Sequence, residues 1–195
     1  ITEKLEKNEP LTDIKGTCYA VDSKDYNYIS GAVECASFEA VSDDSEKGKR
    51  QYAVSCRIQQ EEHDAVRGKT VIQKHGFKIV IQNPPMPPLS TEEMDEVYAL
   101  PFMRDYHPSY KALGGVPGIE EVKFSIIHNR GCIGACNFCS LAYHQGRQIA
   151  VRSHKSVIDE AKKITEMEDF KGYIHDVGGP TANFRHPACE KQLSK

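Results

Sequence analysis

Two segments of the chain carry apolar residues at helical spacing. The first begins with the capping-box pair Ser90 and Glu93 and ends before the next proline. The second begins with a similar pair, Ser156 and Asp159, and continues to about residue 169. The apolar positions that recur in these segments are Met94, Val97, Tyr98, Val157, Ile158, Ala161, Ile164 and Met167. We therefore predict a helix in each segment, with one apolar face against a core.

Four shorter runs have the β-branched, aromatic or alternating composition of strands. They are residues 16–21, 78–82, 122–126 and 172–177. Residues 43–60 are instead polar and predict an exposed helix, whose apolar face would contain Tyr52, Ala53 and Cys56. From residue 122 onward the order is strand, loop, helix, strand, which is the order of a βαβ unit and requires a parallel sheet. Such a sheet needs several strands to bury both faces, so we expect further strands to be encoded beyond Lys195.

Composition narrows the class of protein. The 195 residues include 25 Lys and Arg against 28 Asp and Glu, a net charge of −3, which makes nucleic acid an unexpected partner. No apolar run reaches the ~18 residues that a membrane span needs. The opening residues 1–9 do not resemble a secretory signal, and seven cysteines are an odd number for a secreted disulfide framework. We expect a cytoplasmic protein that does not enter membranes.

Three of the cysteines, Cys132, Cys136 and Cys139, lie within eight residues. Gly131 and Gly134 give the backbone the freedom to curl, so that the three sulfur atoms can converge on a metal. A structural zinc site needs four ligands, and the fourth could come from a histidine or from a distant cysteine; the candidates are His144 and Cys189. The remaining possibility is a [4Fe–4S] cluster with one iron left open. The isolated cysteines Cys18, Cys35 and Cys56 are expected in the core.

The spacing Cys-x3-Cys-x2-Cys, with Phe138 before the last cysteine, resembles the signature of the radical S-adenosylmethionine (SAM) enzymes. Its position after the strand at 122–126 fits that family as well. Wider stretches are similar to the YgiQ-type radical SAM proteins, namely residues 16–19, 83–85, 131–132 and 175–183. The resemblance extends over nearly the whole chain.

The resemblance implies an α/β fold with two parts. Residues 1–113 would be the end of an N-terminal domain, a small α+β segment with a proline-rich connector at 83–89, and residues 114–195 would begin a partial (β/α) radical SAM barrel. Cys132, Cys136 and Cys139 would hold a [4Fe–4S] cluster that reductively cleaves SAM to methionine and a 5′-deoxyadenosyl radical. An electron donor such as flavodoxin or ferredoxin would be a partner. The substrate and oligomeric state stay open, and the truncated barrel is expected to be inactive alone.

The same resemblance implies further cofactor contacts. Phe138 would pack near the adenine of SAM. The second-strand motif of the family usually reads Gly-Gly-Glu and contacts the SAM amino group, whereas this chain has Gly178, Gly179 and Pro180. Proline supplies neither a carboxylate nor an amide donor, so only the backbone carbonyls of the two glycines could take over that contact.

Other polar residues near these motifs are weaker candidates. His175 and Asp176 are placed at the carboxyl end of a predicted barrel strand, where such barrels carry catalytic groups, although a hydrogen-bonded His and Asp is an equally ordinary arrangement. Residues that flank the motifs are Asn183, His128, Asn129, Arg130 and Arg147, which are expected to be solvated or to support the site. Two other functions remain possible: a structural Cys3His zinc module for protein interaction, and an electron-transfer iron–sulfur protein with four protein ligands.

Overall fold

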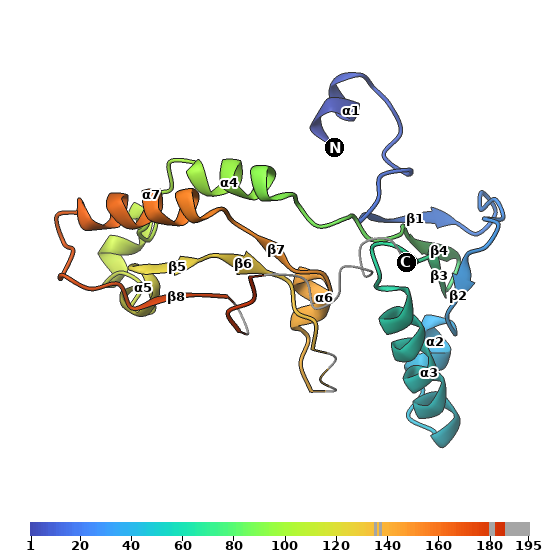
Figure 1. The fold of residues 1–195 in the computed structure, drawn as a ribbon. Coiled ribbons are helices and arrows are strands. Elements are labelled where there is room, and N and C mark those ends of the chain that lie inside the picture. Colours follow the sequence, from blue (N-terminus) through green and yellow to red (C-terminus); the bar gives the residue numbers. More distant parts are fainter. Residues whose placement is uncertain (135, 137, 180–181, 186–195) are drawn as a thin grey trace. The chain divides into compact units, whose positions relative to one another are not determined.

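The computed structural model describes residues 1–134, 136, 138–179 and 182–185. It divides the chain into two compact units, one up to Pro87 and one from Pro88 onward (Figure 1). The division falls inside the proline-rich connector predicted at 83–89. The predicted domain boundary at residue 113 remains a prediction. Pro180 and Cys189 lie outside the described residues.

The first unit contains a four-stranded sheet in the order β1-β4-β3-β2. Its strands are β1 (Cys18–Asp22), β2 (Val33–Glu34), β3 (Val71–His75) and β4 (Lys78–Gln82). β4 pairs antiparallel with β1 and β3, whereas β2 pairs parallel with β3. A two-residue loop joins β3 to β4, and Gly76 supplies the positive φ, 57°, that tight hairpin turns need. The sequence predicts β1 and β4 correctly but misses β2 and β3.

The helix predicted at 43–60 is confirmed as α3 (Glu46–Glu62), but the predicted inner face is wrong. Ser45 begins the helix by accepting a hydrogen bond from the amide of Gly48. Gly48 and Ser55 are buried, whereas Tyr52 is 58% exposed. Small residues face inward because the backbone comes close: a Cβ at Gly48 would overlap the carbonyl of Asp43. Two short helices precede α3, namely α1 (Thr2–Glu6) and α2 (Phe38–Val41).

The isolated cysteines of the first unit do not share one environment. Cys35 is 3% exposed, and its Sγ lies 4.0 Å from the carbonyl oxygen of Ser55. Burial raises the pKa of this thiol. Cys18, on β1, is exposed, and Cys56 is only half-buried. The expectation of a core position is therefore confirmed for Cys35 and wrong for Cys18.

The second unit opens with the predicted capped helix. Ser90 and Glu93 form both hydrogen bonds of the capping box, and α4 ends at Ala99, before Pro101 as predicted. The later helix begins earlier than expected, because Ser153 rather than Ser156 is its N-cap. The elements of this unit in chain order are α4 (Thr91–Ala99), η1 (Pro108–Leu113), α5 (Ile119–Val122), β5 (Ser125–Ile127), β6 (Asn129–Arg130), α6 (Leu141–Gln145), β7 (Ala150–Val151), α7 (His154–Thr165) and β8 (Asp176–Gly178).

The βαβ order is confirmed, because β5 and β8 pair in parallel and α7, which lies between them in sequence, packs on β5 (Figure 1). Phe124, Ile126 and Ile164 form the buried centre, each at most 5% exposed. The predicted strand at 122–126 is shifted, since Val122 ends α5 and the ladder begins only at Ser125. Likewise the run at 172–177 pairs only from Asp176 onward. Within the described ranges, no helix has the length and apolar character required to cross a membrane.

Ile164→Ala is expected to destabilise the second unit by about 2 to 5 kcal/mol, because it leaves a cavity against β5. Urea unfolding followed by circular dichroism measures the loss. Ile158→Ala on the same helix is the matched control, since Ile158 is 53% exposed and its truncation removes little buried surface. Equal destabilisation by both substitutions would contradict the described orientation of α7.

Candidate functional site

The loop that carries Cys132, Cys136 and Cys139 is tied together at its base. β6 pairs antiparallel with β7, with Arg130 opposite Ala150. Two residues after Arg130, the amide of Cys132 donates a hydrogen bond of 3.0 Å to the carbonyl of Gly146. The two ends of the loop are therefore held next to each other by backbone hydrogen bonds.

Gly131 makes this closure possible. Its φ is +89°, and a Cβ at this position would overlap the carbonyl oxygen of Gln148 on the returning chain. The amide of Gly131 also donates a hydrogen bond of 3.3 Å to Oε1 of Gln145. A larger residue would thus encounter both backbone strain and a direct clash. The glycine before the first cysteine is required by the crossing of two chain segments.

The three cysteines are free thiols that differ in exposure. Cys136 is exposed, and Cys132 and Cys139 are half-buried. A Cβ on Gly134 would lie 3.4 Å from Sγ of Cys132 and 3.6 Å from Sγ of Cys136, so two sulfur atoms flank the same glycine. The amide of Cys139 donates to the carbonyl of Cys136 at 3.1 Å, which turns the chain back after the second cysteine.

Among the described residues, no group of three or more His, Cys, Asp or Glu side chains is arranged to hold a metal ion. The sulfur atoms of Cys132 and Cys136 flank Gly134, but the three cysteines do not form a finished metal site among the described residues. His144, the predicted fourth zinc ligand, is exposed in α6 and is not gathered with the cysteines. Phe138 is 93% exposed, so its contact with adenine stays a prediction.

The carboxyl ends of β5 and β8 meet next to this loop. The amide of His128 donates to the carbonyl of Gly178 at 2.9 Å and extends the pairing of the two strands by one bond. A Cβ on Gly178 would lie 2.8 Å from Oδ2 of Asp176 and 2.9 Å from Oδ1 of Asn183. The structure thus brings Asp176 and Asn183 together over a glycine, as two exposed oxygen-bearing side chains.

His175 points elsewhere. Its ring stacks on Tyr173 at 4.9 Å, and its Nδ1 lies 3.3 Å from the carbonyl oxygen of Glu121. Strand alternation explains the separation from Asp176, because neighbouring residues of a strand face opposite sides. Of the predicted pair, only Asp176 lies over Gly178.

His128 and Asn129 are buried polar residues at the junction of the two sheets. His128 is 5% exposed; burial lowers the pKa of its imidazole, and the charge of Arg185 lowers it further. Asn183 and Asp176 act in the opposite direction. Asn129 is fully buried, and its amide lies against Gly179, where a Cβ would overlap it. Within the described part of the chain, Nδ1 of His128 and both polar atoms of the Asn129 side chain have no hydrogen-bond partner.

Arg152 is the buried charge that the sequence analysis missed. Its side chain donates 2.8 Å to the carbonyl of Ile127 and 3.0 Å to the carbonyl of Ser156, and it forms an ion pair with Glu160. The guanidinium also lies 4.2 Å from the ring centre of Tyr98. Glu160 pairs in addition with Arg104. Ser156 and Glu160 lie four residues apart on α7, and Arg152 precedes the N-cap of that helix, so the side chain of Arg152 reaches forward to both.

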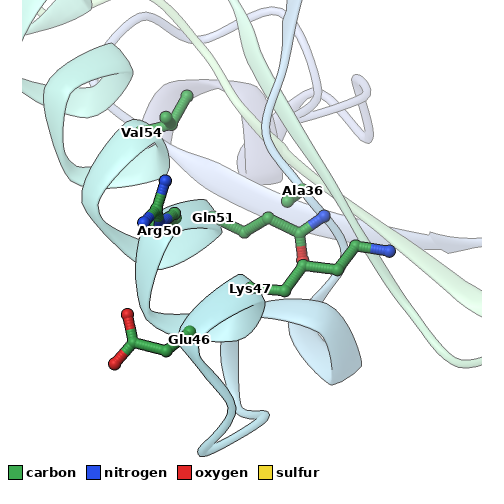
Figure 2. A pocket seen from close by; sticks show the side chains of 6 residues that line it. All are labelled: Ala36, Glu46, Lys47, Arg50, Gln51 and Val54. Carbon is green, nitrogen blue, oxygen red and sulfur yellow. The ribbon is translucent and has the colours of Figure 1, made fainter.

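The first unit contains a separate hollow beside α3, with a volume of about 500 Å³. Figure 2 shows Lys47 and Gln51 extending from the helix toward Ala36. The remaining lining side chains are Glu46, Arg50 and Val54. None of the residues predicted to bind metal or cofactor lines this hollow.

Comparison with known proteins places most of the chain in one family. The family model described as radical SAM N-terminal matches residues 1–125. The chain belongs to this family. The UPF0313 protein of Clostridium botulinum (strain ATCC 19397 / Type A) is 55% identical over 186 residues, which is 95% of this chain and 28% of that protein. The UPF0313 protein CPE1196 of Clostridium perfringens (strain 13 / Type A) is 54% identical over 184 residues, 94% of this chain and 27% of that protein.

These relatives confirm the resemblance to YgiQ-type radical SAM proteins inferred from the motifs. The chain spans only about 28% of the length of the first of them. No solved structure matches the chain. The family match ends at residue 125, just before the cysteine loop, so the loop itself is interpreted from its own residues.

Glu160→Gln is expected to destabilise the second unit by about 3 to 5 kcal/mol, because it leaves two guanidinium groups without their shared carboxylate. Urea unfolding measures the change. Asp159→Asn is the control, since it removes an exposed ion pair with Lys155 on the same helix and should leave the unfolding midpoint nearly unchanged. A small effect of Glu160→Gln would show that the buried ion pairs do not hold α7.

Acidification should destabilise the chain partly through His128. Its pKa in the folded state is held below the ordinary value, so the unfolded state takes up a proton first as the pH falls below about 6.5. The free energy of unfolding should therefore decrease from about pH 7.5 to about pH 5.5. His128→Gln should show a smaller decrease in the same urea titrations. An identical decrease in both proteins would mean that His128 does not contribute.

Proposed function

We propose that this chain carries the iron–sulfur loop of a radical SAM enzyme, in which Cys132, Cys136 and Cys139 hold a [4Fe–4S] cluster and SAM binds beside it. The observation that supports this most directly is the loop itself. Its ends are joined by the β6–β7 pair and the bond from Cys132 to Gly146, and two of its sulfur atoms flank Gly134. The family membership of the chain points to the same chemistry.

The residues fit such a cluster in their chemistry. Thiolates are the ligands that iron–sulfur clusters prefer, and all three are free rather than paired in disulfides. Gly134 leaves the space between the two flanking sulfur atoms open. The motif itself supplies three cysteines, which would leave one iron of a cluster open, whereas a closed Cys3His zinc site would need His144, which is exposed in α6.

When bound, the cluster supplies one electron that breaks the bond between the sulfonium sulfur and C5′ of SAM. The residues of this chain position the base of the cysteine loop. Arg152 fixes the carbonyl of Ile127 at the end of β5, and Gly131 lets the returning chain cross the loop base. Gly178 and Gly179 are the proposed backbone contacts for SAM, and Phe138 is exposed where it can cover a bound adenine.

The parallel pair β5 and β8, with α7 between them in sequence, is proposed to be the start of the (β/α) barrel from residue 114 onward. In such barrels the active site lies at the carboxyl ends of the strands, which is where the cysteine loop and the Asp176–Asn183 pair are found. A one-electron donor of the flavodoxin or ferredoxin type would reduce the cluster, and a cytoplasmic location would suit oxygen-sensitive chemistry.

Cys136→Ala is expected to abolish cluster binding and SAM cleavage in the full-length protein. The protein would be purified without oxygen and reconstituted with iron and sulfide, and its iron and zinc would be counted. Addition of dithionite and SAM would then be followed by assay of 5′-deoxyadenosine. We expect about four irons per chain and 5′-deoxyadenosine in the wild type, and neither in the variant.

Cys18→Ala is the matched control, because Cys18 is an exposed cysteine of the first unit. It should retain both iron and activity. One tightly held zinc in the wild type, with no iron uptake and no SAM cleavage, would overturn the proposal in favour of a structural metal site.

A further inference from the structure

The stretch of chain that carries the cysteine loop has no carboxylate side chain. Residues 122–158 include no Asp or Glu, whereas the chain as a whole has 28 in 195 residues, so a stretch of this length would hold about five at the average frequency. The basic residues of the same stretch are Lys123, Arg130, Arg147, Arg152 and Lys155. The segment around the three cysteines therefore carries only positive formal charges.

Three of these five basic side chains are neutralised by carboxylates from outside the stretch. The ion pairs are Lys123 with Asp105 and Asp169, Arg152 with Glu160, and Lys155 with Asp159. Arg147 takes part in contacts of its own within the fold. Arg130 differs, because it is half-buried and none of the ion pairs among the described residues involves it. A charge that is partly withdrawn from water is favourable only with a counter-charge, so Arg130 indicates an anionic group nearby.

The place of Arg130 in the fold shows where that anionic group would lie. Arg130 is in β6, two residues before Cys132. Two residues of extended chain span at most about 7 Å, so the Cα atoms of Arg130 and Cys132 lie within that distance. Both residues are held in the base of the cysteine loop, Arg130 by its pairing with Ala150 and Cys132 by its hydrogen bond to Gly146. The positive charge of Arg130 is therefore attached beside the first of the three thiols.

We propose that Arg130 is the counter-charge of the iron–sulfur cluster and makes the cluster easier to reduce. This inference rests on the proposed function. Three thiolate ligands give the oxidised cluster a net negative charge, and reduction adds one electron from the flavodoxin- or ferredoxin-type donor without a proton. The reduced form is the more negative of the two, so it gains more from a nearby guanidinium group, which stays protonated throughout. Arg130 acts on SAM cleavage through the cluster and needs no contact with SAM.

The test is a redox titration of the full-length protein, reconstituted with iron and sulfide and followed without SAM by the electron paramagnetic resonance signal of the reduced cluster. Coulomb's law, with an effective dielectric constant of about 20 and a separation of about 10 Å, gives about a 15-fold effect on the reduction equilibrium, and water around a half-buried side chain lowers it. Arg130→Gln should therefore decrease the equilibrium constant for reduction about three- to tenfold, which lowers the midpoint potential by about 30 to 60 mV. Arg130→Lys keeps the charge and should stay close to the wild type.

Lys155→Gln is the matched control, because it removes a positive charge that Asp159 already neutralises. Its midpoint potential should equal that of the wild type, and all three variants should retain their iron. Loss of iron from Arg130→Gln alone would also support the inference, since the charge would then be needed even to hold the cluster.

A wild-type midpoint potential in Arg130→Gln would overturn the inference and leave the proposed function intact. An equal decrease in Arg130→Gln and Arg130→Lys, or loss of iron from both, would overturn it as well, because the shape of Arg130 rather than its charge would then matter. A wild-type protein that takes up no iron would overturn the proposed function together with this inference.

Discussion

The second unit depends on the burial of one positive charge. Arg152 is withdrawn from water entirely, so each of its donors needs a fixed acceptor within the fold. These acceptors come from the end of β5, from the first turn of α7 and from Glu160, and the ring of Tyr98 on α4 covers the guanidinium. The helices α4 and α7 and the end of β5 therefore all contact the guanidinium group of Arg152. None of them can shift without leaving an uncompensated charge in the interior.

This constraint reaches the cysteine loop through the backbone. The amide of Arg152 donates to the carbonyl of His128, and the adjoining β6–β7 pair closes the loop base. The base is consequently held by backbone hydrogen bonds, whereas Phe138 and Cys136 further along the loop are exposed. A fixed base with an exposed tip is a suitable arrangement for thiols that are gathered by a metal, because the protein limits the positions of the sulfur atoms without having to enclose them in advance.

Several glycines also shape the site, each for a different reason. Gly131 allows two chain segments to cross, and Gly134 leaves room between two sulfur atoms. Gly178 and Gly179 give space to the oxygen atoms of Asp176 and Asn183 and to the amide of Asn129. The polar groups at the strand ends can approach the backbone closely only because no side chain stands in the way. The site is thus shaped as much by missing side chains as by those present.

The local features can be predicted from the amino-acid sequence: the capping box at Ser90, the existence of α3 and α7, the parallel βαβ order, the cysteine spacing and the family. These depend on contacts between near neighbours in the chain or on motifs read directly. The folded chain is needed to see that Ser55 rather than Tyr52 faces inward, that β2 and β3 complete the first sheet, and that Arg152 and Asn129 are buried. Burial and pairing between distant segments set those outcomes, and no local pattern records which segments will meet.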